Sequence, residues 1–262
     1  MDLQDHLVSG LASLKKAAEL YVVSWLLGLI AVAFLPIAFF IAALTTVAAL
    51  LRLITLAHVA LILIPFLAAA ILWLLATFAF LVPGVGRLAK WSGVFETPAK
   101  LVKWGCWSAL VSGALALLAG AASLGPLIGG AVTPQAPWLI AGFFAAIALA
   151  VLAGIACLTG FTGLVVALFE LSSQTRVSDF KVAAVLLILG LALGAASLMP
   201  SVSWAMTTDG EVAERVVTMR LGNVLLAVAA GAASIAGWVF ARDAAERALR
   251  APLAPPPPLP SA

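Results

Sequence analysis

The chain is dominated by long apolar stretches that are separated by short polar segments. A helix needs about 20 mostly apolar residues to cross the hydrocarbon core of a bilayer, and each stretch reaches that length. Spanning β-strands would instead show short segments of alternating hydrophobicity. The pattern therefore predicts an all-α polytopic bundle of about six transmembrane helices, over residues 20–44, 56–82, 104–128, 138–169, 182–203 and 219–241.

Composition supports a membrane-embedded chain. Hydrophobic residues make up 65% of its 262 residues and charged residues only 10%, whereas a soluble domain carries about 25% charged residues. We expect three parts: an amphipathic interfacial helix over residues 1–19, a six-span transmembrane domain over residues 20–250, and a Pro-rich disordered tail over residues 251–262.

Polar segments outside the spans have their own patterns. Leu3, Leu7, Leu11 and Leu14 recur at helical spacing, which is typical of a helix lying in the headgroup plane. The loop from Pro83 to Lys103 is rich in basic residues and is interrupted by glycines, so we expect a bent interfacial segment that contacts anionic lipid, or alternatively a coupling helix for an ATPase.

A short outer helix is expected between spans five and six. Thr208 and Glu211 have the spacing of a capping box, which marks a helix N-terminus. The segment that they begin carries appreciable charge, so we expect it to lie on the membrane surface before the sixth span.

Basic residues are distributed unevenly between the two sides that six spans would define. The positive-inside rule places the richer side in the cytoplasm. We therefore expect both termini to be cytoplasmic in a plasma-membrane protein. The richer side carries Lys15, Lys16, Arg87, Lys90, Lys100, Lys103, Arg176, Lys181, Arg242, Arg247 and Arg250, and the other side carries Arg52, Arg215 and Arg220.

Aromatic residues cluster near the predicted inner membrane boundary. Tryptophan and tyrosine at such positions are typical of the belts that anchor helices at the headgroup level. We expect this anchoring role for Tyr21, Trp25, Trp91, Trp104, Trp107 and Trp238.

Small residues repeat every four positions in the later spans. Helices in lipid associate by close van der Waals contact, which small residues permit. We expect helix packing at Gly142 and Gly154 in span four and at Gly190 and Gly194 in span five, with spans three to six forming a tight core. Span four is longer than a bilayer requires, so we expect strong tilt or a bend at residues 159–163.

The first two spans each contain a proline at a similar predicted depth. Pro36 and Pro65 are expected to kink the hairpin, with large neighbours such as Phe66 hindering tight closure. Arg52 and His58 follow at its outer end. These four residues form a candidate pocket or hinge, suited to a lipid tail or a partner's helix; the alternative is that the kinks only shape the hairpin.

The sequence offers little catalytic chemistry. Cys106 and Cys157 have no CxxC neighbour, His58 is the one histidine near a span, and no aspartate lies in a predicted span. We therefore expect no enzyme activity, no cofactor and no metal. Basic residues flank apolar segments instead of clustering, so nucleic acid is not an expected partner.

Two resemblances follow from these segments. The Gly10-Leu11 to Lys15-Lys16 helix that leads into Tyr21-Val22-Val23-Ser24-Trp25, the near-absence of Asn and the Pro-rich tail resemble uncharacterised multi-pass membrane protein families common in archaea. The topological plan is also similar to that of type-two ABC exporter permeases, although residues 201–220 are polar here and not a re-entrant apolar hairpin.

We interpret the chain as a non-catalytic membrane protein with a structural, accessory or assembly role. Its expected partners are membrane lipids and other membrane-protein subunits. The alternative function, implied by the second resemblance, is a transport permease subunit driven by a separate ATPase.

Overall fold

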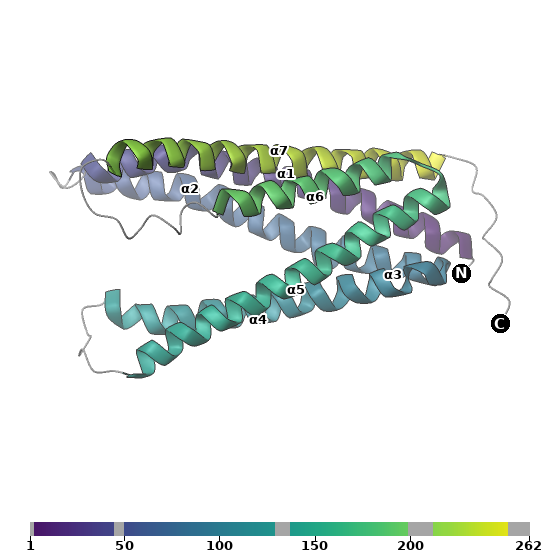
Figure 1. Cartoon of the computed structure of the whole chain (residues 1–262), viewed down its shortest axis with the longest axis horizontal. Helices are drawn as coiled ribbons and strands as arrows, with labels where there is room; N and C mark the ends of the chain where they lie inside the picture. The colour runs from purple at the N-terminus through teal and green to yellow at the C-terminus, as the bar shows by residue number, and fades with distance from the viewer. Residues whose placement is uncertain (1–2, 45–49, 129–136, 199–211, 251–262) are drawn as a thin grey trace. The chain divides into compact units, whose positions relative to one another are not determined.

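The computed structural model describes the backbone of residues 3–44, 50–128, 137–198 and 212–250. Side chains are described for residues 3–31, 63–123, 141–197 and 222–250. Every element assigned within these ranges is helical (Figure 1). The α-helices are α1 (Leu3–Leu44), α2 (Leu50–Leu75), α3 (Val82–Trp91), α4 (Glu96–Ile128), α5 (Pro137–Thr175), α6 (Asp179–Leu198) and α7 (Val212–Arg250).

Two short elements of other helix types lie between α2 and α4. A π-helix, η2, spans Ala76–Leu81 and joins α2 directly to α3. A 3₁₀ turn, η3, spans Gly93–Phe95 and precedes α4. Between α5 and α6, Arg176 has a φ of 58°. This left-handed conformation is commonly used to end a helix, and it lets the chain reverse within three residues.

Five helical stretches in the described side chains are long and apolar enough to cross a membrane. These stretches are Leu63–Trp91, Gly93–Ser123, Ala141–Thr175, Asp179–Ser197 and Gly222–Arg250. They agree with the predicted all-helical, multi-pass membrane protein. The predicted first span lies in α1, whose residues 32–44 are outside the described side chains.

The helices divide into two units. Unit 1 comprises Met1–Gly84 and Leu168–Ala262, and unit 2 comprises Val85–Ala167. Within unit 1, α1 packs against α2 and α7, and α6 packs against α7. The grouping differs from the expected core of spans three to six, because the helices of spans five and six pack with those of spans one and two.

The N-terminal segment is not a separate helix. Helix α1 runs without interruption past residue 19, where we expected an interfacial helix to end. Three leucines of its stripe, Leu7, Leu11 and Leu14, are at most 4% exposed and are covered by protein, whereas Leu3 is 48% exposed. Burial within the structure, instead of contact with headgroups, therefore accounts for this apolar stripe.

The second predicted span also continues past its expected end. The predicted span ends at Val82, just before Pro83, and a proline in a regular α-helix clashes with the carbonyl four residues earlier. The chain instead forms the wider π-helix just before Pro83, and the Val82 amide donates to the carbonyl of Thr77, five residues earlier. This change of hydrogen-bonding register allows the helix to continue through Pro83.

Helices α5 and α7 are longer than the predicted spans. Helix α5 continues through residues 159–163, and the bend or strong tilt that we expected there stays a prediction. Helix α7 runs from Val212 to Arg250 as one element, so the expected outer helix and the sixth span are continuous where they are described. The proposed cap at Thr208 and Glu211 and the Pro-rich tail lie outside the described residues.

Candidate functional site

The predicted first-hairpin site is only partly within the described side chains. Pro36 lies in α1, and Arg52 and His58 lie in α2, but the description covers only their backbone. Pro65 lies inside α2 and is half-buried. The structure therefore places these residues on two packed helices, and the pocket or hinge remains a prediction.

The described contact between α1 and α2 is close. The Ser24 hydroxyl of α1 donates to the backbone carbonyl of Ala69 in α2 at 2.8 Å, and both residues are buried. Phe66, which we expected to hold the helices apart, is instead 61% exposed. Small and polar side chains thus form this part of the contact, while the large aromatic ring lies outside it.

A buried polar and aromatic cluster joins α1, η2 and α7 of unit 1. The Tyr21 hydroxyl lies 2.6 Å from Thr77 Oγ1, and the Tyr21 ring stacks on Trp238 at 4.1 Å between centroids. Thr77 Oγ1 also donates to the carbonyl of Trp73 at 2.8 Å. Because a hydroxyl has one proton, Tyr21 must be the donor to Thr77 in this arrangement.

The π-helix positions one partner of this cluster. Thr77 is 1% exposed and lies in the first turn of η2, while Tyr21 is 4% exposed. π-Helical segments inside α-helices are frequent at functional sites. Here the segment brings a polar side chain of an otherwise apolar stretch to Tyr21. We did not single out Thr77 from the sequence, although a polar residue six positions before a proline within an apolar stretch was a usable signal.

The aromatic residues of the predicted belt differ in their exposure. Trp104 is 69% exposed and Trp107 is 47% exposed, as anchoring at the headgroup level would require. Tyr21, Trp91 and Trp238 are instead buried, so the anchoring role predicted for these three is wrong. Hydropathy places an aromatic residue at a boundary depth, but helix packing decides whether its ring faces lipid or protein.

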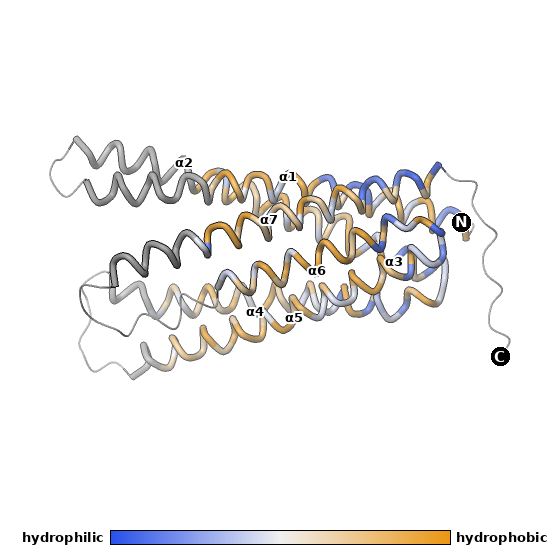
Figure 2. Tube along the Cα trace, turned by 45° about the horizontal axis from the view of Figure 1, so that its top comes forward, coloured by the Kyte–Doolittle hydropathy of each residue, from blue (hydrophilic) through white to orange (hydrophobic). Residues whose placement is uncertain are grey.

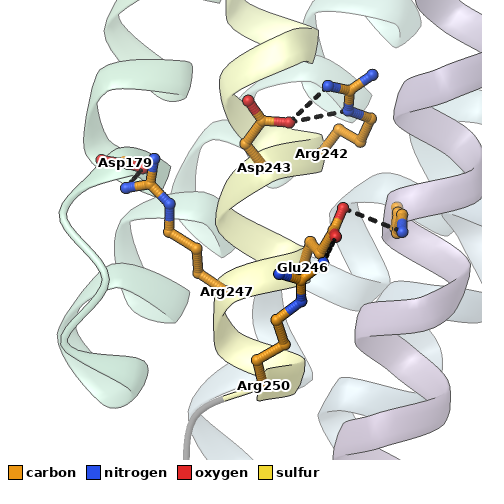
Figure 3. Close-up of polar contacts among 7 residues, drawn as sticks. Asp179, Arg242, Asp243, Glu246, Arg247 and Arg250 are labelled. Carbon is orange, nitrogen blue, oxygen red and sulfur yellow. Dashed lines mark hydrogen bonds and ion pairs between the residues drawn. The ribbon is translucent and has the colours of Figure 1, made fainter.

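Hydrophilic residues gather in unit 1 toward the start of α1 and the end of α7 (Figure 2). Glu246 of α7 pairs with Lys15 of α1 at 3.2 Å and also with Arg250 on its own helix. Arg247 reaches from α7 to Asp179 at the start of α6, at 2.5 Å (Figure 3). These pairs connect three helices of unit 1 at one end.

The remaining described ion pairs are local. Arg242 pairs with the adjacent Asp243 at 2.7 Å. In unit 2, Lys100 pairs with Glu96 one turn earlier on α4, also at 2.7 Å. Exposed pairs of this kind contribute at most about 1 kcal/mol each to stability.

The predicted packing glycines lie in different environments. A Cβ at Gly190 would lie 2.4 Å from Ser234 Oγ of α7, whereas one at Gly194 would lie 3.8 Å from the nearest atom, Ala230 Cβ. In unit 2, a Cβ at Gly142 would lie 2.3 Å from Ser123 Oγ, and one at Gly154 would meet nothing within 4 Å. Gly190 and Gly142 thus face neighbouring helices closely, while Gly154 faces open space.

A glycine that we did not select makes the closest approach to the backbone of another helix among the described glycines. A Cβ at Gly105 of α4 would lie 2.3 Å from the backbone nitrogen of Gly160 in α5. Gly163 of α5 is similarly close to Leu101 and to the carbonyl of Pro98. Gly105 stands at the polar start of α4, outside the spacing-four pattern that guided the prediction.

Among the side chains that the structure describes, the polar contacts of unit 1 are hydrogen bonds and ion pairs. Within the described side chains, no group of three or more His, Cys, Asp or Glu residues could hold a metal ion. Comparisons with known protein families, with curated proteins and with solved structures found no match for this chain.

Proposed function

We propose that the chain is a plasma-membrane protein with six spans and cytoplasmic termini, and that its role is structural, accessory or assembly-related. The observation that carries this proposal is the way unit 1 uses its polar groups. Tyr21, Thr77 and Ser24 hydrogen bond within the chain, and Glu246 and Asp179 pair with basic residues of neighbouring helices. Such groups stabilise a scaffold.

Exposed surface supports the same proposal. Large apolar side chains cover the described spans, including Leu117 at 77% exposed, Ile64 at 65% and Leu225 at 65%. Surfaces of this kind are matched by lipid tails or by the spans of other membrane proteins. We therefore propose membrane lipids and other membrane-protein subunits as the partners.

Native electrophoresis of membranes solubilised in a mild detergent tests this role. The chain should migrate within a larger assembly, and deleting its gene should lower the mass or the amount of that assembly. Re-expression of the wild-type chain should restore it. Arg247→Ala, which breaks the contact between α7 and α6, should restore it less well than Lys100→Ala, which breaks only a pair within α4.

Two results would overturn the accessory role. One is migration of the chain alone, with every other membrane complex unchanged by the deletion. The other is co-migration with an ATPase whose hydrolysis rate depends on the chain, which would favour the permease implied by the topological resemblance.

A further inference from the structure

One face of α4 is exposed along most of the described part of the helix. Lys103, Trp104, Trp107, Val111, Leu115 and Leu118 follow one another at intervals of one, three or four residues, so they lie along one side of the helix. All of them are exposed. The opposite side, which includes Gly105 and Val102, packs against Gly160 and Gly163 of α5.

The chemistry of this face changes along the helix. The face begins with a cationic side chain, Lys103. In the described part of the chain, Lys103 forms no ion pair with an acidic residue. The neighbouring Lys100 is already paired with Glu96. The next turn carries the exposed indoles of Trp104 and Trp107, and the following turns carry aliphatic side chains alone.

This order matches the profile of a single phospholipid. An anionic headgroup would meet Lys103, the glycerol and ester region would meet the two indoles, and the acyl chains would lie along Val111, Leu115 and Leu118. The 15 helical steps from Lys103 to Leu118 extend about 22 Å. One leaflet, with its headgroups, is about 20–22 Å thick.

We propose that this face of α4 is a binding site for an anionic glycerophospholipid in the leaflet at the helix's N-terminal end. The bulk of the side chains argues against another helix as the occupant. Close helix pairing in membranes uses small residues, and α4 presents Gly105 to α5 while presenting Trp104 and Leu118 on the exposed face. The proposal requires α4 to lie in a bilayer and does not depend on the accessory role.

Quenching of tryptophan fluorescence by brominated lipid tests the site directly. The full-length protein is reconstituted into phosphatidylcholine vesicles that contain increasing fractions of phosphatidylglycerol, with bromine on the acyl chains of one lipid at a time. The signal of interest is the difference between wild type and Trp104→Phe, because the chain has eight tryptophans. Brominated phosphatidylglycerol should quench this signal with about fivefold higher apparent affinity than brominated phosphatidylcholine, as expected for one lysine near an anionic headgroup.

A second lysine provides the matched control. Lys181 is exposed at the start of α6, and the exposed residues that follow it, Val182 and Val185, are aliphatic. Lys103→Gln should remove the preference for phosphatidylglycerol, and Lys181→Gln should leave it intact. High salt should weaken the wild-type preference by screening the lysine.

Two results would overturn the proposal. The first is equal quenching of the Trp104 signal by the two lipids in the wild-type protein. This result does not depend on how the lysine variants fold. An equal loss of preference in Lys103→Gln and Lys181→Gln would show that lipid selection reflects the total charge of the protein and not this face of α4.

Discussion

Replacing Gly105 with alanine should weaken the pairing of α4 with α5. The added Cβ would lie 2.3 Å from the nitrogen of Gly160, 2.5 Å from its Cα and 2.8 Å from the carbonyl oxygen of Ala156. All three are backbone atoms, so no side-chain rotation can relieve the overlap. The helices must separate locally by about 1 Å to restore ordinary van der Waals contact.

The magnitude follows from this separation. A radial gap of about 0.5–1 Å forfeits a quarter to a half of the dispersion energy of each affected contact, and overpacking of a close contact typically costs about 1–3 kcal/mol. Alanine also favours the helix over glycine by about 1 kcal/mol. Gly154→Ala isolates that second effect, because nothing lies within 4 Å of the added methyl group. Gly105→Ala should therefore be about 1–3 kcal/mol less stable than Gly154→Ala.

The other glycine of the same crossing should tolerate the same change. A Cβ at Gly160 would lie 3.4 Å from the nitrogen and from Sγ of Cys106, which is ordinary contact. Reversible unfolding of each variant in mixed micelles of a mild detergent and dodecyl sulfate, followed by circular dichroism, gives the free energies. If Gly105→Ala is as stable as Gly154→Ala and Gly160→Ala, the close approach of α4 and α5 at Gly105 is refuted.

Three further predictions concern unit 1 and topology. Tyr21→Phe should lower the free energy of unfolding by about 1 kcal/mol in the same assay, because it removes the hydrogen bond to Thr77 and keeps the aromatic ring; an unchanged value would contradict a buried bond. Gly190→Ala should lower the thermal midpoint in detergent, since its methyl group would overlap Ser234, whereas a midpoint equal to wild type would place this residue away from α7. A cysteine at Thr208 should react with an impermeant maleimide only from outside the cell, and one in the C-terminal tail only from the cytoplasm; labelling of both from one side would refute the six-span model.

The sequence predicts the long apolar helices of the described structure but not their ends. The predicted span over residues 182–203 corresponds to α6 over Asp179–Leu198. By contrast, α4 begins at Glu96, eight residues before the predicted start at Trp104. Hydropathy marks the part of a helix that suits lipid, whereas a helix can continue into water when pairs such as Glu96 and Lys100 support its exposed turns.

Helix packing is less accessible to sequence reasoning. A spacing of four residues puts Gly142 and Gly154 on one stripe of α5, but only Gly142 lies against a neighbouring side chain, that of Ser123. The spacing identifies a face and gives no information on where along that face another helix crosses. Gly105 and Gly160 come together because α4 and α5 cross there, which is a property of two helices that neither segment encodes by itself.

The π-helix before Pro83 shows why neither the end of a helix nor its packing could be predicted from local sequence. A proline disturbs a regular α-helix, because its ring removes a donor and meets the preceding carbonyl. At Pro83 the helix could end. It could also continue after a π-helical turn, in which an amide bonds to the carbonyl five residues earlier instead of four. The second outcome is favoured when the widened turn gains tertiary contacts. Here it buries Thr77 beside Tyr21, which in turn stacks on Trp238 of α7. The choice is therefore made by residues more than 50 positions away in the chain, and local pattern alone could not have supplied it.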